Sequence, residues 1–398
     1  MSQIQRTPLL LEITLRNLLS FGPDTPPLKL THLNVLVGPN GSGKSNLIAG
    51  IALLRSMTGE WRDVLAKGGG SREWIWKGKP DDSAEISATI GGIVVMPSDD
   101  STTLVHAIKL GPRFNLNRLE IQAENVSVCS VEGSLSFRYR NDLGITAVMY
   151  RADGTLQDVS RNIDANASIL AQWRDPMNAP EITLLEKVYK QIQLYREWTF
   201  GRHSVCRQPQ RADERSDRLA EDFSNLGMFL NRLRRNPKAK AAVLDGLRDL
   251  YEGLTDFDVI VEGGTVQVFF TEGEFAIPAT RLSDGTIRYL CLLAILCDPE
   301  PPPLICIEEP ELGMHPDLIP RIADLLVDAS TRTQLIVTTH SDILVDALTE
   351  TPECIIICEK HNGQTEMTRL NADDLKVWLE NYTLGTLWIK GQLGGKRW

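Results

Sequence analysis

Residues 35–47 read Val-Leu-Val-Gly-Pro-Asn-Gly-Ser-Gly-Lys-Ser-Asn-Leu, an apolar run that leads through a glycine-rich loop into a predicted helix. From Gly38 to Ser45 the loop matches the pattern G-x-x-x-x-G-K-[ST]. Small residues let backbone N–H groups close around phosphate, and the helix N-terminus adds a positive dipole end. We expect Lys44 to reach the terminal phosphates and the Ser45 hydroxyl to bind Mg²⁺. The residues predicted to line this site are Asn40, Gly41, Ser42, Gly43, Lys44, Ser45 and Asn46.

The composition is typical of a globular chain, with 398 residues, 42% hydrophobic, 24% charged and a formal net charge of −10. A chain with this charge does not coat nucleic acid with its whole surface. The first residues lack a signal-peptide pattern, and no apolar run approaches the ~20 residues that span a bilayer. The seven cysteines are widely spaced and odd in number, which favours reduced thiols. We therefore expect a cytoplasmic protein without membrane contact.

The secondary-structure pattern changes along the chain. Short alternating runs between residues 83 and 150 predict an antiparallel meander. From residue 181 the period becomes helical, with apolar stripes at 185–195 and 219–233. Between residues 282 and 358, buried strands alternate with helices, as in a parallel sheet. The expected fold is α/β, with a mixed sheet, an antiparallel β subdomain and an inserted helical subdomain.

Three further motifs lie at predicted strand or helix ends. Glu308 and Glu309 directly follow a buried strand, and His340 follows the next one. Ligands of open parallel sheets bind at such strand ends. Glu308 is therefore a candidate Mg²⁺ ligand and Glu309 a candidate base or water-polarising group. Ser283-Asp284-Gly285 reads as a helix start. Taken singly, each motif has a structural alternative: an acidic turn, a structural histidine or an ordinary cap.

In this order, the four motifs resemble the ABC-type ATPase head in the branch of the SMC, RecF and OLD-like ATPases. The likeness is strongest over residues 1–60 and 280–360. It implies a P-loop NTPase of ABC-ATPase head type, a compact bacterial AAA-type ATPase related to anti-phage defence. The three expected parts are a first lobe with the phosphate loop at 1–150, a helical insertion replacing a coiled-coil arm at 151–258, and a second lobe with the remaining motifs at 259–398.

The resemblance also implies a mechanism. Two heads would dimerise head to tail around two ATP molecules, with Mg²⁺. Glu309 would be the catalytic carboxylate and His340 the switch histidine of a slow or partner-stimulated ATPase. The residues expected to close over the nucleotide held by Lys44 of the other head are Ser283, Asp284 and Gly285.

Other assignments from the resemblance are less direct. Asn17, Ser20 and Phe21 fall where the first strand of the family approaches the nucleotide. Glu308 stands where the family pattern has Asp, and Gln122 is the candidate for the Q-loop glutamine. A long coiled-coil arm is absent from the pattern, and the residues after the histidine are too few for the nuclease domain of OLD-like proteins.

Basic residues concentrate between Arg196 and Lys240, where eleven of them stand against six acidic residues. This window predicts either DNA contact or a solvated helical face. The first functional hypothesis is a switch that acts on DNA or on a separately encoded nuclease or other effector. The alternatives are a RecF-like repair or recombination ATPase and an ATP-dependent assembly scaffold. Trp61, Trp74 and Trp76 could stack on a base or pack against the sheet.

Overall fold

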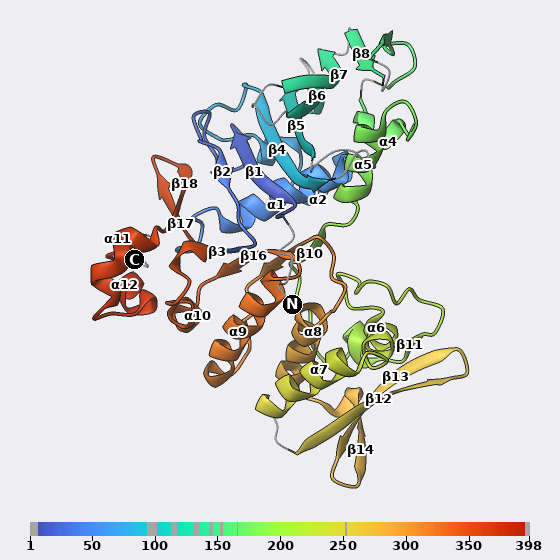
Figure 1. The fold of residues 1–398 in the computed structure, drawn as a ribbon, viewed down its shortest axis with the longest axis vertical. Coiled ribbons are helices and arrows are strands. Elements are labelled where there is room, and N and C mark those ends of the chain that lie inside the picture. The colour runs from blue at the N-terminus through green and yellow to red at the C-terminus, as the bar shows by residue number, and fades with distance from the viewer. Residues whose placement is uncertain are drawn as a thin grey trace. The chain divides into compact units, whose positions relative to one another are not determined.

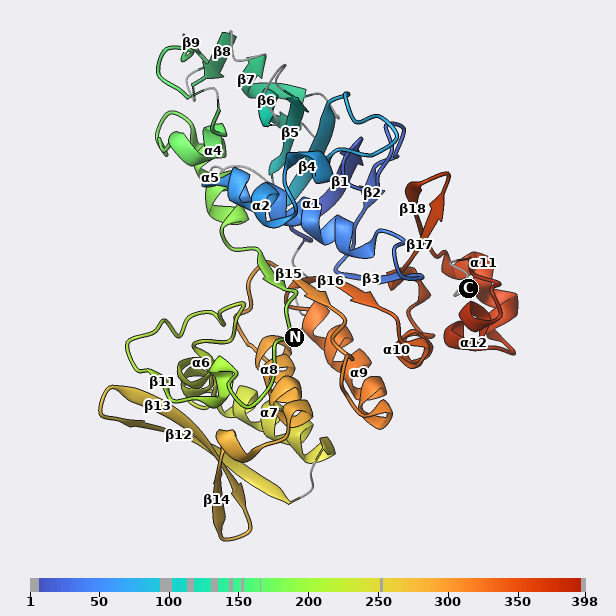
Figure 2. The same ribbon diagram turned by 180° about the vertical axis from the view of Figure 1, so that it is seen from behind.

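The computed structural model describes residues 7–93, 102–112, 118–129, 135–142, 146–151, 154–164, 166–250 and 253–394. The chain divides into two compact units. Unit 1 comprises residues 1–192, 353–370 and 393–398, and unit 2 comprises residues 193–352 and 371–392. Figures 1 and 2 show the ribbon from opposite sides.

An antiparallel sheet forms a large part of unit 1. Its strands follow the order β2-β1-β4-β5-β6-β7-β8-β9, and each neighbouring pair is antiparallel. Ile13 and Leu15 of β1 are buried on one face, as the period of two in a strand requires. The meander predicted between residues 83 and 150 is confirmed. The strands are β1 (Leu10–Arg16), β2 (Leu28–Lys29), β4 (Ala84–Ile93), β5 (Thr102–Pro112), β6 (Leu119–Cys129), β7 (Leu135–Asp142), β8 (Thr146–Tyr150) and β9 (Leu156–Asp158).

Three other strands of unit 1 lie at the phosphate loop, which directly follows the first of them. β3 (Leu33–Val37) pairs in parallel with β17 (Ile355–His361), which pairs antiparallel with β18 (Gln364–Arg369). All residues of β3 are buried, as expected of a strand covered on both faces. Asn362 and Gly363 join β17 to β18 with φ values of 50° and 79°, the signs that a type I′ turn requires. The helices of unit 1 are α1 (Lys44–Ser56), α2 (Trp61–Lys67), α3 (Ser71–Trp74), α4 (Ile169–Gln172) and α5 (Pro180–Tyr189).

Parallel strands in the order β10-β15-β16 form the central sheet of unit 2. They are β10 (Gln193–Tyr195), β15 (Leu304–Glu308) and β16 (Gln334–Thr339). The apolar residues of β15 are all buried, which explains their continuous run in the sequence. The register places Glu308 opposite Thr338, so the carboxyl ends of β15 and β16 lie side by side.

Helices and a second, antiparallel sheet complete unit 2. The helix predicted across residues 219–233 begins only at Leu226, because Phe223 has a φ of 61° that a right-handed helix cannot contain. The α-helices are α6 (Leu226–Leu233), α7 (Pro237–Leu250), α8 (Asp284–Leu296), α9 (Ile319–Ser330), α10 (Asp342–Ala347), α11 (Ala372–Leu379) and α12 (Leu384–Ile389). Short 3₁₀ turns are η1 (Val205–Arg207), η2 (Ala279–Arg281) and η3 (Pro316–Leu318). The second sheet comprises β11 (Gln210–Arg211), β12 (Leu254–Glu262), β13 (Thr265–Glu272) and β14 (Phe275–Pro278).

The segment 151–258, predicted as a helical insertion, contains α4 to α7 but also β9, β10, β11 and the start of β12. Every helix in the described part of the chain is too short or too polar to cross a lipid bilayer.

Candidate functional site

The phosphate loop joins β3 to α1 in a shape that requires glycine at two positions. Gly43 is the N-cap of α1 and has a φ of 103°, in the left-handed region. A Cβ on Gly43 would lie 2.0 Å from Thr365 Oγ1. A Cβ on Gly38 would lie 2.2 Å from the main-chain oxygen of Cys358. The loop is therefore packed directly against β17 and β18.

Thr365, in β18, holds the loop in this shape. Its hydroxyl donates to the main-chain oxygen of Ser42 at 2.8 Å and lies 2.6 Å from Ser20 Oγ. Ser20 Oγ in turn accepts from Asn46 Nδ2 at 2.7 Å. Ser20 therefore lies beside the phosphate loop, and its expected contact with the nucleotide stays a prediction. Sequence analysis missed Thr365 because it belongs to no motif and lies far along the chain from the loop.

Lys44 folds back onto its own loop. Its Nζ donates to the main-chain oxygens of Gly38 at 2.7 Å and Pro39 at 3.0 Å, and the residue is only 5% exposed. The buried Ser42 Oγ has no hydrogen-bond partner among the residues that the structure describes. An ammonium group turned into the loop beside a buried unpaired hydroxyl fits the needs of a bound phosphate. The loop residues that are exposed are Asn40, Gly41 and Ser45.

A hollow of about 510 Å³ lies beside the loop within unit 1. Trp76 lines it and donates from Nε1 to the main-chain oxygen of Gly363 at 3.1 Å. Trp61 and Trp74 are instead 2% and 3% exposed, so the packing alternative holds for these two. The lining residues are Leu19, Ser20, Asn46, Glu73, Trp76, Lys77, Gly78, Lys360, Asn362 and Gly363.

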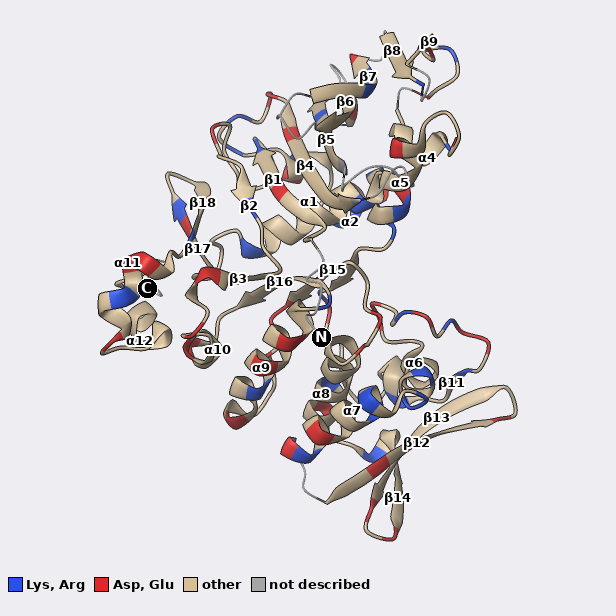
Figure 3. Ribbon diagram, viewed as in Figure 1, with Lys and Arg blue, Asp and Glu red and all other residues tan. Residues whose placement is uncertain are grey.

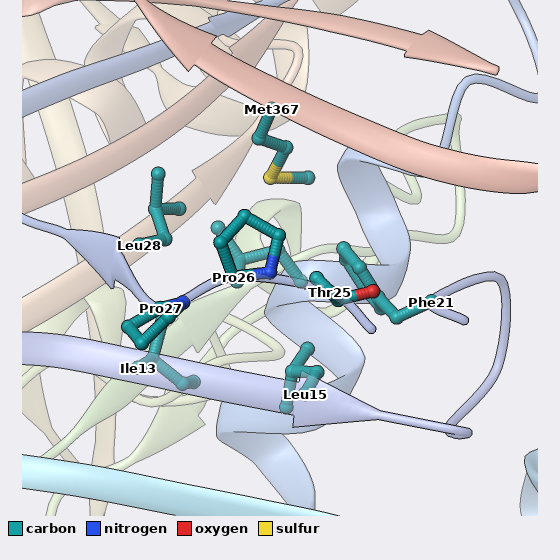
Figure 4. Close-up of a pocket in the computed structure, with 9 residues that line it drawn as sticks. Ile13, Leu15, Phe21, Thr25, Pro26, Pro27, Leu28 and Met367 are labelled. Atoms are coloured by element: carbon teal, nitrogen blue, oxygen red, sulfur yellow. The ribbon is translucent and has the colours of Figure 1, made fainter. Parts of the chain in front are cut away.

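Phe21 lies in a different environment from Ser20. It lines a small apolar pocket with residues of β1, β2 and α1 and is 3% exposed (Figure 4). Its aromatic ring serves the core of unit 1, and its nucleotide contact stays a prediction. The other lining residues are Ile13, Leu15, Thr25, Pro26, Pro27, Leu28, Leu47 and Met367.

Asn17 and Gln122 make hydrogen bonds within the same unit. Asn17 Nδ2 donates to the main-chain oxygens of Lys79 at 3.2 Å and Ser83 at 3.3 Å. Gln122 Oε1 accepts from Ser83 Oγ at 2.7 Å. These bonds fix the segment before β4, and the nucleotide-related roles of both residues stay predictions.

The strand ends of unit 2 bring two predicted residues together. Glu309 follows β15, His340 follows β16, and His340 Nε2 lies 3.4 Å from Glu309 Oε1. The main-chain N–H of Glu309 donates to the Thr338 oxygen at 3.0 Å, which fixes the turn after β15. A carboxylate and an imidazole at adjacent strand ends can position a water molecule and move its proton.

Glu311 holds the backbone at His340 in place, a role that sequence analysis did not assign. Its Oε1 accepts from Thr339 Oγ1 at 2.6 Å and from the main-chain N–H of His340 at 3.0 Å. Within the described part of the chain, its buried Oε2 has no hydrogen-bond partner. Burial of the carboxyl raises the pKa of Glu311 above its usual range, against the lowering effect of the Thr339 hydrogen bond.

Glu308 is engaged by two residues that follow β10. Arg196 Nε lies 2.8 Å from Glu308 Oε1, and Trp198 Nε1 donates to the main-chain oxygen of Glu308 at 2.7 Å. In the described residues, no group of three or more His, Cys, Asp or Glu side chains could hold a metal ion. Mg²⁺ bound by Glu308 would therefore take its further ligands from water, and from phosphate oxygens where nucleotide is bound, as is usual for this ion.

Ser283 begins α8 as predicted. Its Oγ accepts from the main-chain N–H of Thr286 at 3.1 Å, an N-cap bond. Arg207, which is 7% exposed, donates to the main-chain oxygen of Leu282 and lies 2.5 Å from Asp284 Oδ1. A Cβ on Gly285 would make only an ordinary contact, so packing within the chain does not explain this glycine. Arg207 fixes the exposed start of α8 from inside the unit.

The basic window from Arg196 to Lys240 is largely neutralised. Figure 3 shows acidic residues interspersed with the basic ones along this segment. Seven of its eleven basic residues form ion pairs, several of them with acidic residues outside the window. The paired residues are Arg196, Arg207, Arg211, Arg215, Arg232, Arg234 and Lys240. The pairing favours the structural alternative over a DNA-binding patch.

Comparison with known families adds to this geometry. The family described as "AAA domain, putative AbiEii toxin, Type IV TA system" matches residues 33–98 and 180–346, more than half of the chain. The chain belongs to this family. The match covers both the phosphate loop and the strand-end residues of this AAA-domain protein. A comparison with curated proteins finds no match.

Solved structures define the fold. A crystal structure of an Smc head bound to the C-winged helix domain of ScpA is 18% identical, with a TM-score of 0.56 over 92% of this chain and 99% of that one. An Smc head with an extended coiled coil, bound to the C-terminal domain of ScpA from Pyrococcus furiosus, is 17% identical, with a TM-score of 0.54 over 94% and 99%. This AAA-domain protein has the fold of an SMC head, in agreement with the predicted fold of an ABC-type ATPase head.

Proposed function

We propose that this AAA-domain protein binds ATP at the phosphate loop and hydrolyses it, with Glu309 as the catalytic carboxylate. The observation that carries the proposal is the 3.4 Å approach of His340 Nε2 to Glu309 Oε1 at neighbouring strand ends. Glu309 would polarise the attacking water, and His340 would hold that water or the γ-phosphate. Lys44 would exchange the carbonyls of its own loop for phosphate oxygens, and Ser45 with Glu308 would bind Mg²⁺.

The hollow beside the loop supports a nucleotide rather than phosphate alone. It adjoins Asn46 in the first turn of α1 and offers the indole of Trp76 for stacking. We place the nucleoside part of ATP there, with Ser20 and Asn46 near the loop. Phe21 would contribute by packing β1 against α1.

A head-to-tail dimer is part of the proposal. Ser283 is exposed at the N-terminus of α8, where free N–H groups favour an anion. Gly285 is a glycine without an internal packing reason, which suits close approach by a ligand. Ser283, Asp284 and Gly285 of one head would close over the ATP held by the other, so that binding joins two chains and hydrolysis separates them.

The wider role proposed is a cytoplasmic switch in bacterial defence that acts on a separately encoded nuclease or other effector. The family description, which names a toxin of a type IV system, supports this class of role. The paired basic window gives DNA contact less support, which counts against the RecF-like repair ATPase. The remaining alternative, an ATP-dependent assembly scaffold, needs no DNA contact.

Nucleotide binding, turnover and oligomeric state test the proposal together. The wild type should bind ATP, form a dimer in light scattering when ATP is present, and release phosphate slowly. Lys44→Ala should lose ATP binding, whereas Lys67→Ala, at the exposed end of α2, should behave as the wild type. ATP binding that survives in Lys44→Ala, or a wild type that stays monomeric with ATP, would contradict the proposal.

A further inference from the structure

Glu308, the carboxylate expected to face a metal ion, is paired with a cation of its own chain. Arg196 Nε lies 2.8 Å from Glu308 Oε1, and the two side chains are 36% and 17% exposed. Partial burial reduces the screening that weakens ion pairs at the surface. The pair is also separate from the Glu309–His340 pair, because it uses the last residue of β15 rather than the residue after it.

Arg196 is held in place from both sides along the chain. It directly follows β10, whose Tyr195 is in register with Ile307 of β15. Trp198, two residues later, donates to the main-chain oxygen of Glu308 at 2.7 Å. This fixed segment presents Arg196 to the Glu308 carboxylate.

Aromatic stacking strengthens the hold on this segment. The Trp198 ring stacks on Phe223 with centroids 5.5 Å apart. The Arg288 guanidinium lies 5.4 Å from the centroids of both Trp198 and Phe200. Burial lowers the pKa of Arg288, against the raising effect of Glu309. Arg196 therefore extends from a segment that is held by strand pairing, a hydrogen bond and ring stacking.

A guanidinium and a divalent cation compete for one carboxylate, since each cation repels the other there. We propose that Arg196 takes the place of the metal at Glu308 and keeps divalent cations off this carboxylate while no nucleotide is bound. Metal then enters together with the phosphates that supply its remaining ligands. The inference rests on the proposed function only for the assignment of Glu308 as the carboxylate that faces the metal.

Mn²⁺ titration of the nucleotide-free protein, followed by the electron paramagnetic resonance signal of free Mn²⁺, tests this inference. Arg196→Ala should bind Mn²⁺ about tenfold more tightly than the wild type at one site, a difference of about 1.4 kcal/mol. Arg196→Lys keeps the positive charge and should titrate close to the wild type. The double variant Arg196→Ala/Glu308→Gln should lose the added affinity, and Arg202→Ala, an exposed arginine of the same segment, should leave Mn²⁺ binding unchanged.

An Arg196→Ala protein that titrates as the wild type would overturn the inference, as would a double variant that keeps the added affinity. Arg196→Gln, which retains part of the stem that packs on the segment, is the same test if Arg196→Ala does not fold. The titration uses no ATP. A wild type that fails to bind ATP in a parallel measurement would contradict the proposed function and leave the Mn²⁺ result to decide this inference.

Discussion

Glu309 reaches His340 from a strained backbone: the two side chains are 3.4 Å apart while Glu309 has a φ of 47°. A left-handed conformation is uncommon for a residue other than glycine and costs on the order of 1–3 kcal/mol. Such strain persists where the surroundings impose it. Here the hydrogen bond from Glu309 N to the Thr338 oxygen, at 3.0 Å, ties the turn to the neighbouring strand.

Glu309→Gln should leave ATP binding intact and lower the rate of hydrolysis by about 100-fold or more, because a general base is removed while the shape is kept. The variant should also accumulate as a dimer in the presence of ATP, seen by light scattering. Glu350→Gln, at an exposed glutamate of the same unit, is the matched control. Normal phosphate release from Glu309→Gln would show that the carboxylate is assigned wrongly.

Arg207→Ala should weaken the ATP-dependent dimer by about tenfold without changing the affinity of a single chain for nucleotide. Arg207 holds the Leu282 oxygen and the Asp284 carboxylate, so its loss frees the start of α8 from the unit behind it. Analytical ultracentrifugation with ATP measures the dimer constant. Arg211→Ala, whose ion pair with Asp213 is exposed, should leave that constant unchanged. A dimer of full strength in Arg207→Ala would remove Arg207 from this role.

Glu311→Gln should raise the free energy of unfolding at neutral pH by about 1 kcal/mol, because it removes a negative charge that burial disfavours while its amide oxygen can still accept from Thr339 and His340. Burial raises the pKa of Glu311 in the folded state, so between the unfolded and folded pKa values the unfolded chain binds fewer protons. Its contribution to stability is therefore full below the unfolded pKa and falls as pH rises through the folded pKa. In thermal unfolding from pH 4 to 8, the stability of the wild type relative to Glu311→Gln should fall as pH rises. Parallel pH profiles for the two proteins would contradict the prediction.

Cys206 should be alkylated before the other buried thiols at neutral pH. A hydrogen bond from the Cys291 thiol lowers the pKa of Cys206 to about 7, against the raising effect of burial. Burial raises the pKa values of Cys297 and Cys358 to about 12. Peptide mass mapping after brief iodoacetamide treatment at pH 7 measures the order. Cys291→Ala should slow the labelling of Cys206 at that pH, and an unchanged rate would show that Cys291 does not activate it.

The sequence predicted the phosphate loop and both strand ends because their signals are local. A loop of fixed spacing between an apolar run and a helix, or a carboxylate directly after a buried run, needs only neighbouring residues to be recognised. The hydrogen bond of Thr365 to the Ser42 oxygen joins residues 323 positions apart, and the Arg196–Glu308 bond joins residues 112 apart. Neither has a local pattern, so neither could be predicted.

The basic window shows a second limit of sequence reasoning. A count of charges between Arg196 and Lys240 includes only the acidic residues of the same segment. Arg234 and Lys240 pair with Asp258 and Asp256 of β12, which lie outside the window. The sum of charges within the window therefore overstated its positive charge, because acidic residues elsewhere in the chain neutralise some of the basic ones.

The hydrogen bond of Thr365 to the Ser42 oxygen bears on where this protein can be cut for study. The family match ends at residue 346, before β17 and β18 begin. A fragment trimmed to those limits would keep every recognisable motif. It would lose the β17–β18 hairpin, whose Thr365 hydrogen-bonds to the phosphate loop. Inactivity of such a fragment would reflect the loss of the Thr365 hydrogen bond to the loop and not the absence of a catalytic residue.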